Sequence, residues 1–288
     1  MRWLKKNALT LILVVILLAG LGLIAYPSFS DYWNSFHQSR AIASYAESVA
    51  DMSQEKYDEI LAEAEAYNAK MAKTGLMWRE LTDKEKKEYD AQLDVGASGI
   101  MGYIDIPKID VTLPIYHGTE EAVLQVAIGH LEGTSLPVGG KGSHCVMSGH
   151  RGLPSAKLFS DLDKMVEGDT FSLTIMNRTL TYEVDQIRVV EPTDLSDLQL
   201  EKGKDLCTLV TCTPYGINTH RLLVRGHRTS NPNGDANIIA DALQIEPIYI
   251  APFLAVPILL LMVIGVFVQS HNRSAAAKKR RKQESAGR

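Results

Sequence analysis

Two long apolar runs, one near each end of the chain, most constrain how this sequence can fold. Residues 8–26 and 248–268 contain no charged side chain. At a rise of about 1.5 Å per residue, each run as a helix comes close to crossing the hydrocarbon core of a bilayer. The second run contains Pro252 and Pro257, which membrane helices tolerate and soluble helix interiors do not. The sequence therefore predicts two transmembrane helices that flank one folding unit.

Basic residues flank both apolar runs on their outer sides. Arg2, Lys5 and Lys6 precede the first run, and the basic segment 278–282 follows the second. By the positive-inside rule, both termini are predicted to be cytoplasmic and residues 27–247 to be extracellular. A cleaved signal peptide is the alternative for the first run, but the run is long for a signal and its Ala-x-Ala-type site is poor, which favours a retained anchor. The net charge of −4 gives no indication of nucleic-acid binding.

Three cysteines, Cys145, Cys207 and Cys212, lie in the segment predicted to be extracellular. They are too few and too unevenly spaced for a disulfide framework, so at least one thiol is free and requires an explanation. Cys207, Cys212 and His220 do not have the close spacing of structural zinc ligands. The sequence predicts no metal site and no cofactor.

The first part of the extracellular segment is predicted to be helical. Residues 31–73 contain no proline or glycine and are rich in good helix formers, so one long helix or two in tandem are expected, packed against the domain that follows. Thr82 with Glu85 three residues later forms a capping-box pattern, which predicts a second, short helix. Between them, residues 75–81 form an apolar patch with Trp78 in a predicted loop.

From about residue 99 the pattern changes to short apolar or alternating segments enriched in β-branched residues. Strands are predicted at residues 103–116, 171–175, 180–190, 206–211 and 221–225, and helical patterns occur at 121–130 and 155–165. Closely spaced strands with few helices indicate a mainly β fold, a mostly antiparallel barrel or sandwich. Residues 230–236 form a polar linker to the second apolar run.

Cys212 differs from the other two cysteines in its position at the end of a predicted strand. The apolar segment 207–211 leads into it, and Pro214 follows two residues later. Proline cannot donate to a β-ladder, so Cys212 is predicted at the rim of the sheet, where its thiol is reachable. Cys207 lies five positions earlier, an odd offset, so its side chain points to the opposite face and is interpreted as a core residue.

A nucleophilic cysteine needs a base or a lowered pKa, and histidine is its usual partner. His150 lies in the small-residue loop SGHRG just after a predicted strand. His220 is the alternative because it is close to Cys212 in sequence, but on the next strand it points to the face opposite Arg221.

Acyl transfer requires stabilisation of an oxyanion. An antiparallel neighbour places Arg221 beside the thiol, whereas Arg225 lies roughly 13 Å further along its strand.

These residues lie in sequence blocks that resemble the signatures of sortases. TLVTC at 208–212, followed by TPYGINTHRLLVRGHR, resembles the family's cysteine motif, and SGHRG at 148–152 matches its histidine motif. The similarity extends over residues 99–228 and is closest to class C, the pilin-polymerising sortases, which two membrane anchors also fit. The resemblance implies an eight-stranded sortase β-barrel with short helices, preceded by an N-terminal helical segment and flanked by two transmembrane helices.

The resemblance also implies a reaction and the residues that perform it. Cys212 would attack the Thr–Gly bond of an LPXTG-like sorting signal and form a thioacyl enzyme. His150 would protonate the leaving amine and deprotonate the incoming one, and Arg221 would hold the substrate carbonyl. In class C the incoming amine is a lysine of a pilin subunit. Two alternatives stay open: a sortase that attaches single surface proteins to the cell-wall precursor, and a non-catalytic membrane-anchored scaffold for pilus assembly.

Class C sortases usually carry a lid over the active site with an Asp-Pro-aromatic anchor. No proline occurs here between Pro27 and Pro107, so that anchor is absent, and Trp78 is predicted to belong to a looser lid. The alternative is a connection between helices with Trp78 packed on the outer wall of the barrel. The resulting division of the chain is a membrane anchor at 1–28, an extracellular helical segment with the possible lid at 29–98, the catalytic barrel at 99–230, a linker at 231–247, a transmembrane helix at 248–268 and a basic cytoplasmic tail at 269–288.

Overall fold

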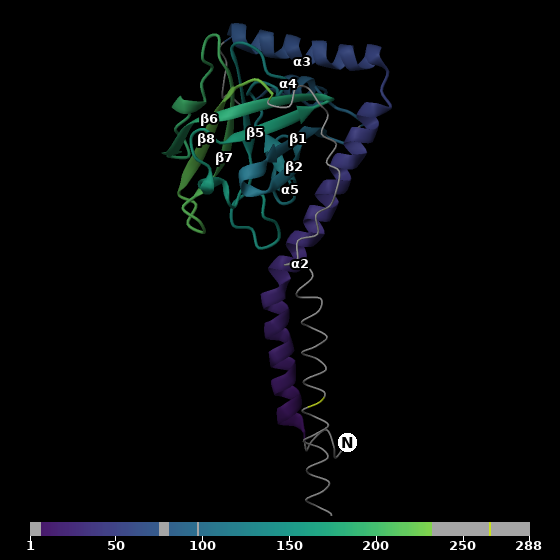
Figure 1. Cartoon of the computed structure of the whole chain (residues 1–288), viewed down its shortest axis with the longest axis vertical. Coiled ribbons are helices and arrows are strands. Elements are labelled where there is room, and N and C mark those ends of the chain that lie inside the picture. Colours follow the sequence, from purple (N-terminus) through teal and green to yellow (C-terminus); the bar gives the residue numbers. More distant parts are fainter. Residues whose placement is uncertain (1–6, 75–80, 97, 232–264, 266–288) are drawn as a thin grey trace, which may run out of the picture. The chain divides into compact units, whose positions relative to one another are not determined.

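A computed structural model describes residues 7–74, 81–96, 98–231 and 265 of the chain (Figure 1). The described residues belong to two units, the first with residues 7–29 and 265 and the second with the described residues from 30 to 231. Apart from residue 265, the second predicted transmembrane segment at 248–268 lies outside the described residues.

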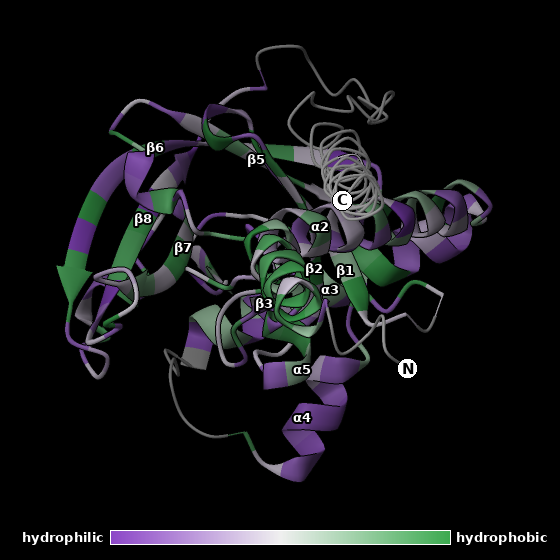
Figure 2. Ribbon diagram, turned by 90° about the horizontal axis from the view of Figure 1, so that it is seen from below, coloured by the Kyte–Doolittle hydropathy of each residue, from purple (hydrophilic) through white to green (hydrophobic). Residues whose placement is uncertain are grey.

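The first apolar run forms the beginning of helix α2 (Ala8–Ala50), which is 43 residues long and contains Pro27. Within the described residues it is the one helix that is long and apolar enough to cross a membrane. In Figure 2 its apolar section is green, in contrast to the mostly purple helix α4. The predicted N-terminal apolar helix is therefore confirmed.

The helical run predicted at 31–73 consists of two helices in tandem. Helix α2 ends at Ala50, and helix α3 (Gln54–Thr74) begins after a three-residue break. In this break the Ser53 hydroxyl accepts a hydrogen bond from the Lys56 N–H at 3.3 Å. Such a side-chain acceptor satisfies one of the free N–H groups in the first turn of a helix, which favours a new helix start at this point.

Both helices pack on the second unit's core, as the sequence predicts. The side chains of Tyr45 on α2 and Leu61 on α3 are buried in the same hydrophobic cluster as the barrel residues. The Tyr45 hydroxyl donates a hydrogen bond to the Met101 carbonyl and accepts one from the Met176 N–H, both at 2.8 Å. Burial raises the pKa of this hydroxyl, so it stays protonated and can make both bonds.

Eight strands form a closed barrel in the order β1-β2-β3-β4-β7-β8-β6-β5. Neighbouring strands are antiparallel except in the pairs β2–β3 and β4–β7. The predicted eight-stranded barrel with short helices is therefore confirmed. The strands are β1 (Ile100–Ile106), β2 (Val111–His117), β3 (Ile128–His130), β4 (Ser143–Ser148), β5 (Thr170–Ile175), β6 (Arg178–Val190), β7 (Asp205–Thr213) and β8 (His220–Arg228), and the short helices are η1 (Pro107–Ile109), α5 (Glu121–Leu124), η2 (Leu162–Lys164) and η3 (Ser196–Leu198).

Three predicted elements are divided or shortened in the structure. Residues 103–116 form two strands rather than one, because η1 and Asp110, which has a left-handed φ of 52°, reverse the chain between them. The helical pattern at 121–130 ends after α5, since residues 128–130 pair with β2 as strand β3. The pattern at 155–165 contains only the three-residue helix η2. In each case strand pairing or a turn overrides the local helical or strand preference.

Helix α4 (Asp83–Asp90) begins at the predicted capping box. The Thr82 side chain accepts a hydrogen bond from the Glu85 N–H, and the Glu85 carboxylate accepts one from the Thr82 N–H. The two groups thereby satisfy N–H groups that a helix start leaves free. The predicted capping box and the short helix that follows it are therefore confirmed.

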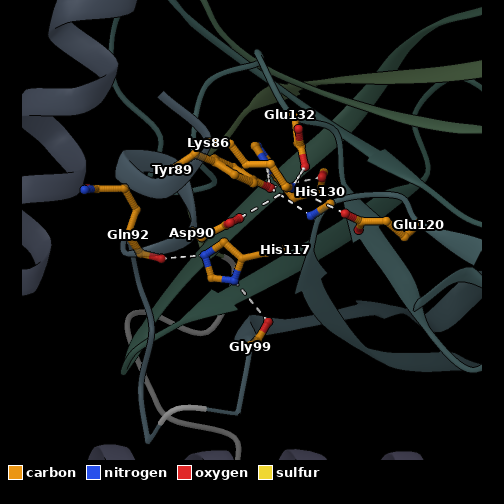
Figure 3. A network of polar contacts seen from close by, with 10 residues as sticks. Lys86, Tyr89, Asp90, Gln92, Gly99, His117, Glu120, His130 and Glu132 are labelled. Atoms are coloured by element: carbon orange, nitrogen blue, oxygen red, sulfur yellow. Dashed lines mark hydrogen bonds and ion pairs between the residues drawn. The ribbon is translucent and has the colours of Figure 1, made fainter. Parts of the chain in front are cut away.

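Tyr89 attaches α4 to the barrel through a buried polar network (Figure 3). Its hydroxyl lies 2.9 Å from His130 Nδ1 and accepts the Gly118 N–H at 3.0 Å. His130 Nε2 lies 2.8 Å from the Ser135 carbonyl oxygen, so Nε2 carries the proton and Nδ1 accepts from Tyr89. Burial lowers the pKa of His130 to about 4, so the ring is neutral at pH 7. Because these buried atoms all have partners, α4 has one defined position on the barrel.

The apolar patch that contains Trp78 precedes α4. Residues 75–80, including Trp78, lie outside the described residues. The possible lid therefore stays a prediction.

Candidate active site

The register of three neighbouring strands brings the predicted residues Cys212, His150 and Arg221 to one level of the barrel wall. Strands β7 and β8 are antiparallel, and Cys212 pairs directly with Arg221. Strands β4 and β7 are parallel, and Ser148 pairs with Val210. His150 and Cys212 each follow two residues after this last pair. Directly paired residues of neighbouring strands share a face, so Cys212 and Arg221 lie on one face, and His150, two residues beyond the end of β4, lies at the same end of the sheet.

The two faces of β4, β7 and β8 carry two different hydrophobic clusters. Cys207, Leu209 and Val224 belong to the barrel core. The alternate residues Val146, Val210 and Leu223 form a smaller cluster with Leu198 of η3, which lies in the loop between β6 and β7. Residues 146, 210 and 223 have the same strand parity as residues 150, 212 and 221. The predicted site therefore lies on the outer face, at the end of an apolar floor that the β6–β7 loop covers.

Cys212 is the partly exposed cysteine of the three, whereas Cys145 and Cys207 are buried. Cys207 pairs with Cys145 across β4 and β7, and burial raises its thiol pKa well above the usual value. Both observations agree with the strand-parity prediction that Cys207 is a core residue. Strand β7 extends through Thr213, two residues further than predicted. Cys212 is therefore the second-to-last residue of the strand rather than the residue after it.

Arg221 and Arg225 have different environments. Arg225 makes two bonds to Asp185, at 2.9 and 3.2 Å, and one to Glu201 at 2.9 Å. Arg221 donates only to the backbone oxygens of His220 and Asn218, at 3.2 and 3.4 Å, and has no carboxylate partner among the described residues. The guanidinium of Arg221 is therefore available for an oxygen of a substrate, and that of Arg225 is not.

His150 is partly exposed and is held by the loop that follows it. Its carbonyl oxygen accepts the Phe159 N–H at 3.1 Å. The same loop contacts α2, because the Lys157 N–H donates to the Asp31 carboxylate at 2.6 Å. Within the described part of the chain, the buried His150 Nε2 atom has no hydrogen-bond partner.

The nearby Glu121 was not found from the sequence. Its carboxylate lies 3.6 Å from His150 Nε2. A hydrogen bond from the Gln125 amide, and to a smaller degree the charge of His150, lowers the pKa of Glu121 below its ordinary value. Glu121 is 29 positions before His150, and nothing in the local sequence pattern links the two residues. Their proximity follows from the placement of α5 beside β3.

His220, the alternative base, lies on the other side of the strand. It pairs with Thr213 rather than with Cys212. Its Nε2 atom lies 3.2 Å from Glu191, and the side chain is 40 % exposed. The predicted opposition of His220 and Arg221 is therefore present in the structure.

The β6–β7 loop that covers the apolar floor is tied to the sheet by buried polar contacts. His144 Nδ1 lies 2.9 Å from the Gln199 carbonyl oxygen, and its Nε2 lies 2.7 Å from the Thr208 hydroxyl. Burial lowers the pKa of His144, which keeps the ring neutral. Together with the bond between Arg225 and Glu201, these contacts give the loop a defined position next to the predicted site.

A closed β-barrel with a cysteine, a histidine and an arginine at one level of its outer face defines a candidate cysteine enzyme of the acyl-transfer type. The sortase domain model matches residues 104–229. Sortase D of Bacillus subtilis is 30 % identical over 153 residues, which are 52 % of this chain and 73 % of that protein. Sortase A of Staphylococcus aureus is 31 % identical over 146 residues, 49 % of this chain and 69 % of that protein.

Solved structures give the same result. Sortase C1 of Streptococcus agalactiae is 57 % identical, with a TM-score of 0.65, and the match covers 67 % of this chain and 99 % of that chain. Sortase C of Streptococcus pneumoniae is 42 % identical, with a TM-score of 0.59, covering 67 % of this chain and 97 % of that one. The chain belongs to the sortase family, whose members are cysteine transpeptidases. Its structural neighbours include class C sortases.

Proposed function

We propose that this protein is a pilin-polymerising sortase, which cleaves an LPXTG-like sorting signal and transfers the acyl group to a lysine amine of a pilin subunit. The observation that carries the proposal is the direct pairing of Cys212 with Arg221, with His150 two residues beyond the parallel pair of Ser148 and Val210 at the same end of the sheet. Support for the pilin step comes from the class C neighbours, of which the pneumococcal structure was described in terms of pilin substrate specificity.

In the proposed first step, the Cys212 sulfur attacks the threonine carbonyl carbon of the sorting signal. The carbonyl oxygen becomes an oxyanion, which the guanidinium of Arg221, having no carboxylate partner among the described residues, is suited to stabilise. The C–N bond to glycine then breaks, and His150 gives its proton to the departing amine. The product is a thioester between Cys212 and the threonine, and the C-terminal part of the signal leaves.

In the second step, a lysine amine attacks the thioester carbonyl. His150 takes a proton from the attacking nitrogen, an amide forms, and the C–S bond breaks to regenerate Cys212. The same two protein groups serve in both directions, because the second step reverses the proton transfers of the first. No metal or cofactor is required for this sequence.

Replacing Arg221 by Lys is expected to lower the rate of thioester formation by about 10²-fold, the typical cost of one lost oxyanion donor. Lysine keeps the charge but lacks the planar pair of donors that can hold a carbonyl oxygen as it becomes negative. The measurement is single-turnover labelling with a sorting peptide. Arg178→Lys is the matched control and should react normally, because Arg178 lies at the start of β6 in an exposed ion pair with Glu65 of helix α3. A normal rate for Arg221→Lys would indicate that backbone N–H groups form the oxyanion site.

The membrane arrangement is part of the same proposal. Helix α2 is long and apolar enough to anchor the protein. With the second apolar run as another span and basic residues at both ends, the enzyme would be a two-pass protein of the cell membrane with its barrel outside. Its substrates, proteins with LPXTG-like signals, would then meet the active site at the outer surface.

The acceptor is tested by offering the full-length enzyme in detergent a sorting-signal substrate with either a pilin subunit or a peptidoglycan-like amine. A covalent pilin ladder on a denaturing gel is the expected result. Product with the peptidoglycan-like amine alone would indicate a sortase that attaches single proteins to the cell wall. Absence of any thioester with Cys212 would indicate the non-catalytic scaffold.

A further inference from the structure

The two chain segments that carry His150 and Cys212 lose their backbone pairing just before these residues. The β4–β7 ladder ends at Ser148 and Val210. The Gly149 N–H still donates to the Val210 carbonyl at 3.1 Å, and the Thr211 hydroxyl donates to the Gly149 carbonyl at 2.8 Å. Beyond Gly149, no backbone bond of the described residues joins the two segments. Their separation at the site must therefore be set by side chains.

Arg151, the residue after His150, makes the next connection. Its Nη1 donates to the Thr213 hydroxyl at 3.3 Å, and Thr213 is the residue after Cys212. Its Nη2 donates to the carboxylate of Asp163, which lies in η2 of the following loop. The Arg151 side chain is only 8 % exposed, unusually low for an arginine at a strand end.

Tyr215 closes this arrangement from the turn between β7 and β8. The Arg151 guanidinium carbon lies 5.7 Å from the centre of the Tyr215 ring, within cation–π range. The same ring packs against Gly152, where an added Cβ would lie 3.0 Å from two ring carbons. Gly152 also has a φ of +78°, which a side chain would strain. Arg151 is thus held by residues from two separate parts of the chain, η2 and the end of β7 with its turn.

We infer that Arg151 is a positioning residue. Its side-chain contacts fix the distance between His150 and Cys212 beyond the point where the backbone hydrogen bonds between β4 and β7 end. Thr213 points to the face opposite Cys212, so Arg151 acts from behind the reacting groups and does not touch the substrate. One guanidinium can hold Thr213 and Asp163 together, because its two terminal nitrogens point in fixed and different directions. The inference rests on the proposed roles of His150 and Cys212.

The test is a double-mutant cycle in the full-length enzyme, with Arg151→Lys, Thr213→Val and the two combined. The ammonium of Lys can contact Asp163 or Thr213 but lacks the two terminal nitrogens with which Arg151 contacts both. Valine at position 213 removes the hydroxyl acceptor and keeps the shape of the side chain. Each single variant is expected to slow thioester formation at saturating sorting peptide by about 10- to 100-fold, the scale of an ångström-sized misplacement. The half-saturating peptide concentration should change little, because the substrate contacts are untouched.

Two further results separate positioning from a structural role. The double variant should be no slower than the slower single variant, since both changes remove the same hydrogen bond between Arg151 and Thr213. Thr213→Ser keeps the hydroxyl and should restore a near-normal rate, and Arg178→Lys serves as the distant control.

The inference is overturned if Arg151→Lys and Thr213→Val only lower the unfolding temperature and leave the rate at saturation unchanged, or if their effects on the rate simply multiply. These outcomes leave the proposed function intact as long as the unmodified enzyme forms the thioester. If the unmodified enzyme forms none, the proposed function fails, and this inference fails with it.

Discussion

Replacing Cys212 by Ala is expected to abolish formation of the covalent intermediate with a sorting peptide. The thiolate is the atom that attacks, and no other side chain at this level of the barrel can replace it. Loss of a nucleophile typically costs on the order of 10⁴-fold or more in turnover. The measurement is mass spectrometry of the full-length enzyme after incubation with the peptide, which detects the acyl adduct directly, together with the rate of product release.

The other two cysteines provide the matched controls for this prediction. Cys145 and Cys207 are buried free thiols that lie opposite each other in the register of β4 and β7. Cys145→Ala and Cys207→Ala should therefore keep turnover and lower the free energy of unfolding by about 1 kcal/mol, the ordinary cost of a small core change. An acyl adduct in Cys212→Ala, or its loss in Cys207→Ala, would show that the strand faces have been assigned to the wrong residues.

Part of the site could be predicted because it is local in sequence. Cys212 and Arg221 are nine positions apart in one hairpin, and alternation along two antiparallel strands suffices to place them side by side. The same alternation separates Cys207 from Cys212 and His220 from Arg221. The capping box at Thr82 is local as well, since it requires only two residues and the helix between them.

The rest of the site depends on contacts that no local pattern encodes. His150 reaches the level of Cys212 through the parallel pairing of β4 with β7, which joins residues 62 positions apart, such as Ser148 and Val210. From the sequence, His150 could be proposed only from its loop and from the family resemblance. Glu121 and Asp163 had no comparable signal. Their approach to His150 and Arg151 results from how α5 and η2 are placed by the barrel.

The predicted bounds of some helices and strands were wrong for the same reason. Residues 128–130 continue an apparently helical pattern, but as strand β3 they pair with β2 on one side and with β4 on the other. The strand that carries Cys212 was predicted to end at residue 211. It continues to Thr213 because β8 pairs with it up to that residue, immediately before Pro214 removes the next donor.

The second large effect is expected for His150→Ala, which should slow thioester formation by on the order of 10⁴-fold or more. Without an imidazole at this level, the departing amine has no proton donor, and the thiol has no neighbouring base. Residues that act as one unit do not contribute independently, so the combination of His150→Ala with Cys212→Ala should be no slower than Cys212→Ala alone.

His220→Ala is the control that decides between the two histidines. His220 is 40 % exposed, lies 3.2 Å from Glu191, and faces away from Cys212. Its removal breaks a surface contact with Glu191, and such contacts contribute about 0–1 kcal/mol, so the rate should stay within a few-fold of normal. Single-turnover labelling across pH 5 to 9 measures both variants under identical conditions. In the strand register, His220 lies opposite Thr213 and not opposite Cys212. A slow His220→Ala variant together with a fully active His150→Ala variant would therefore contradict the assignment of His150 as the base.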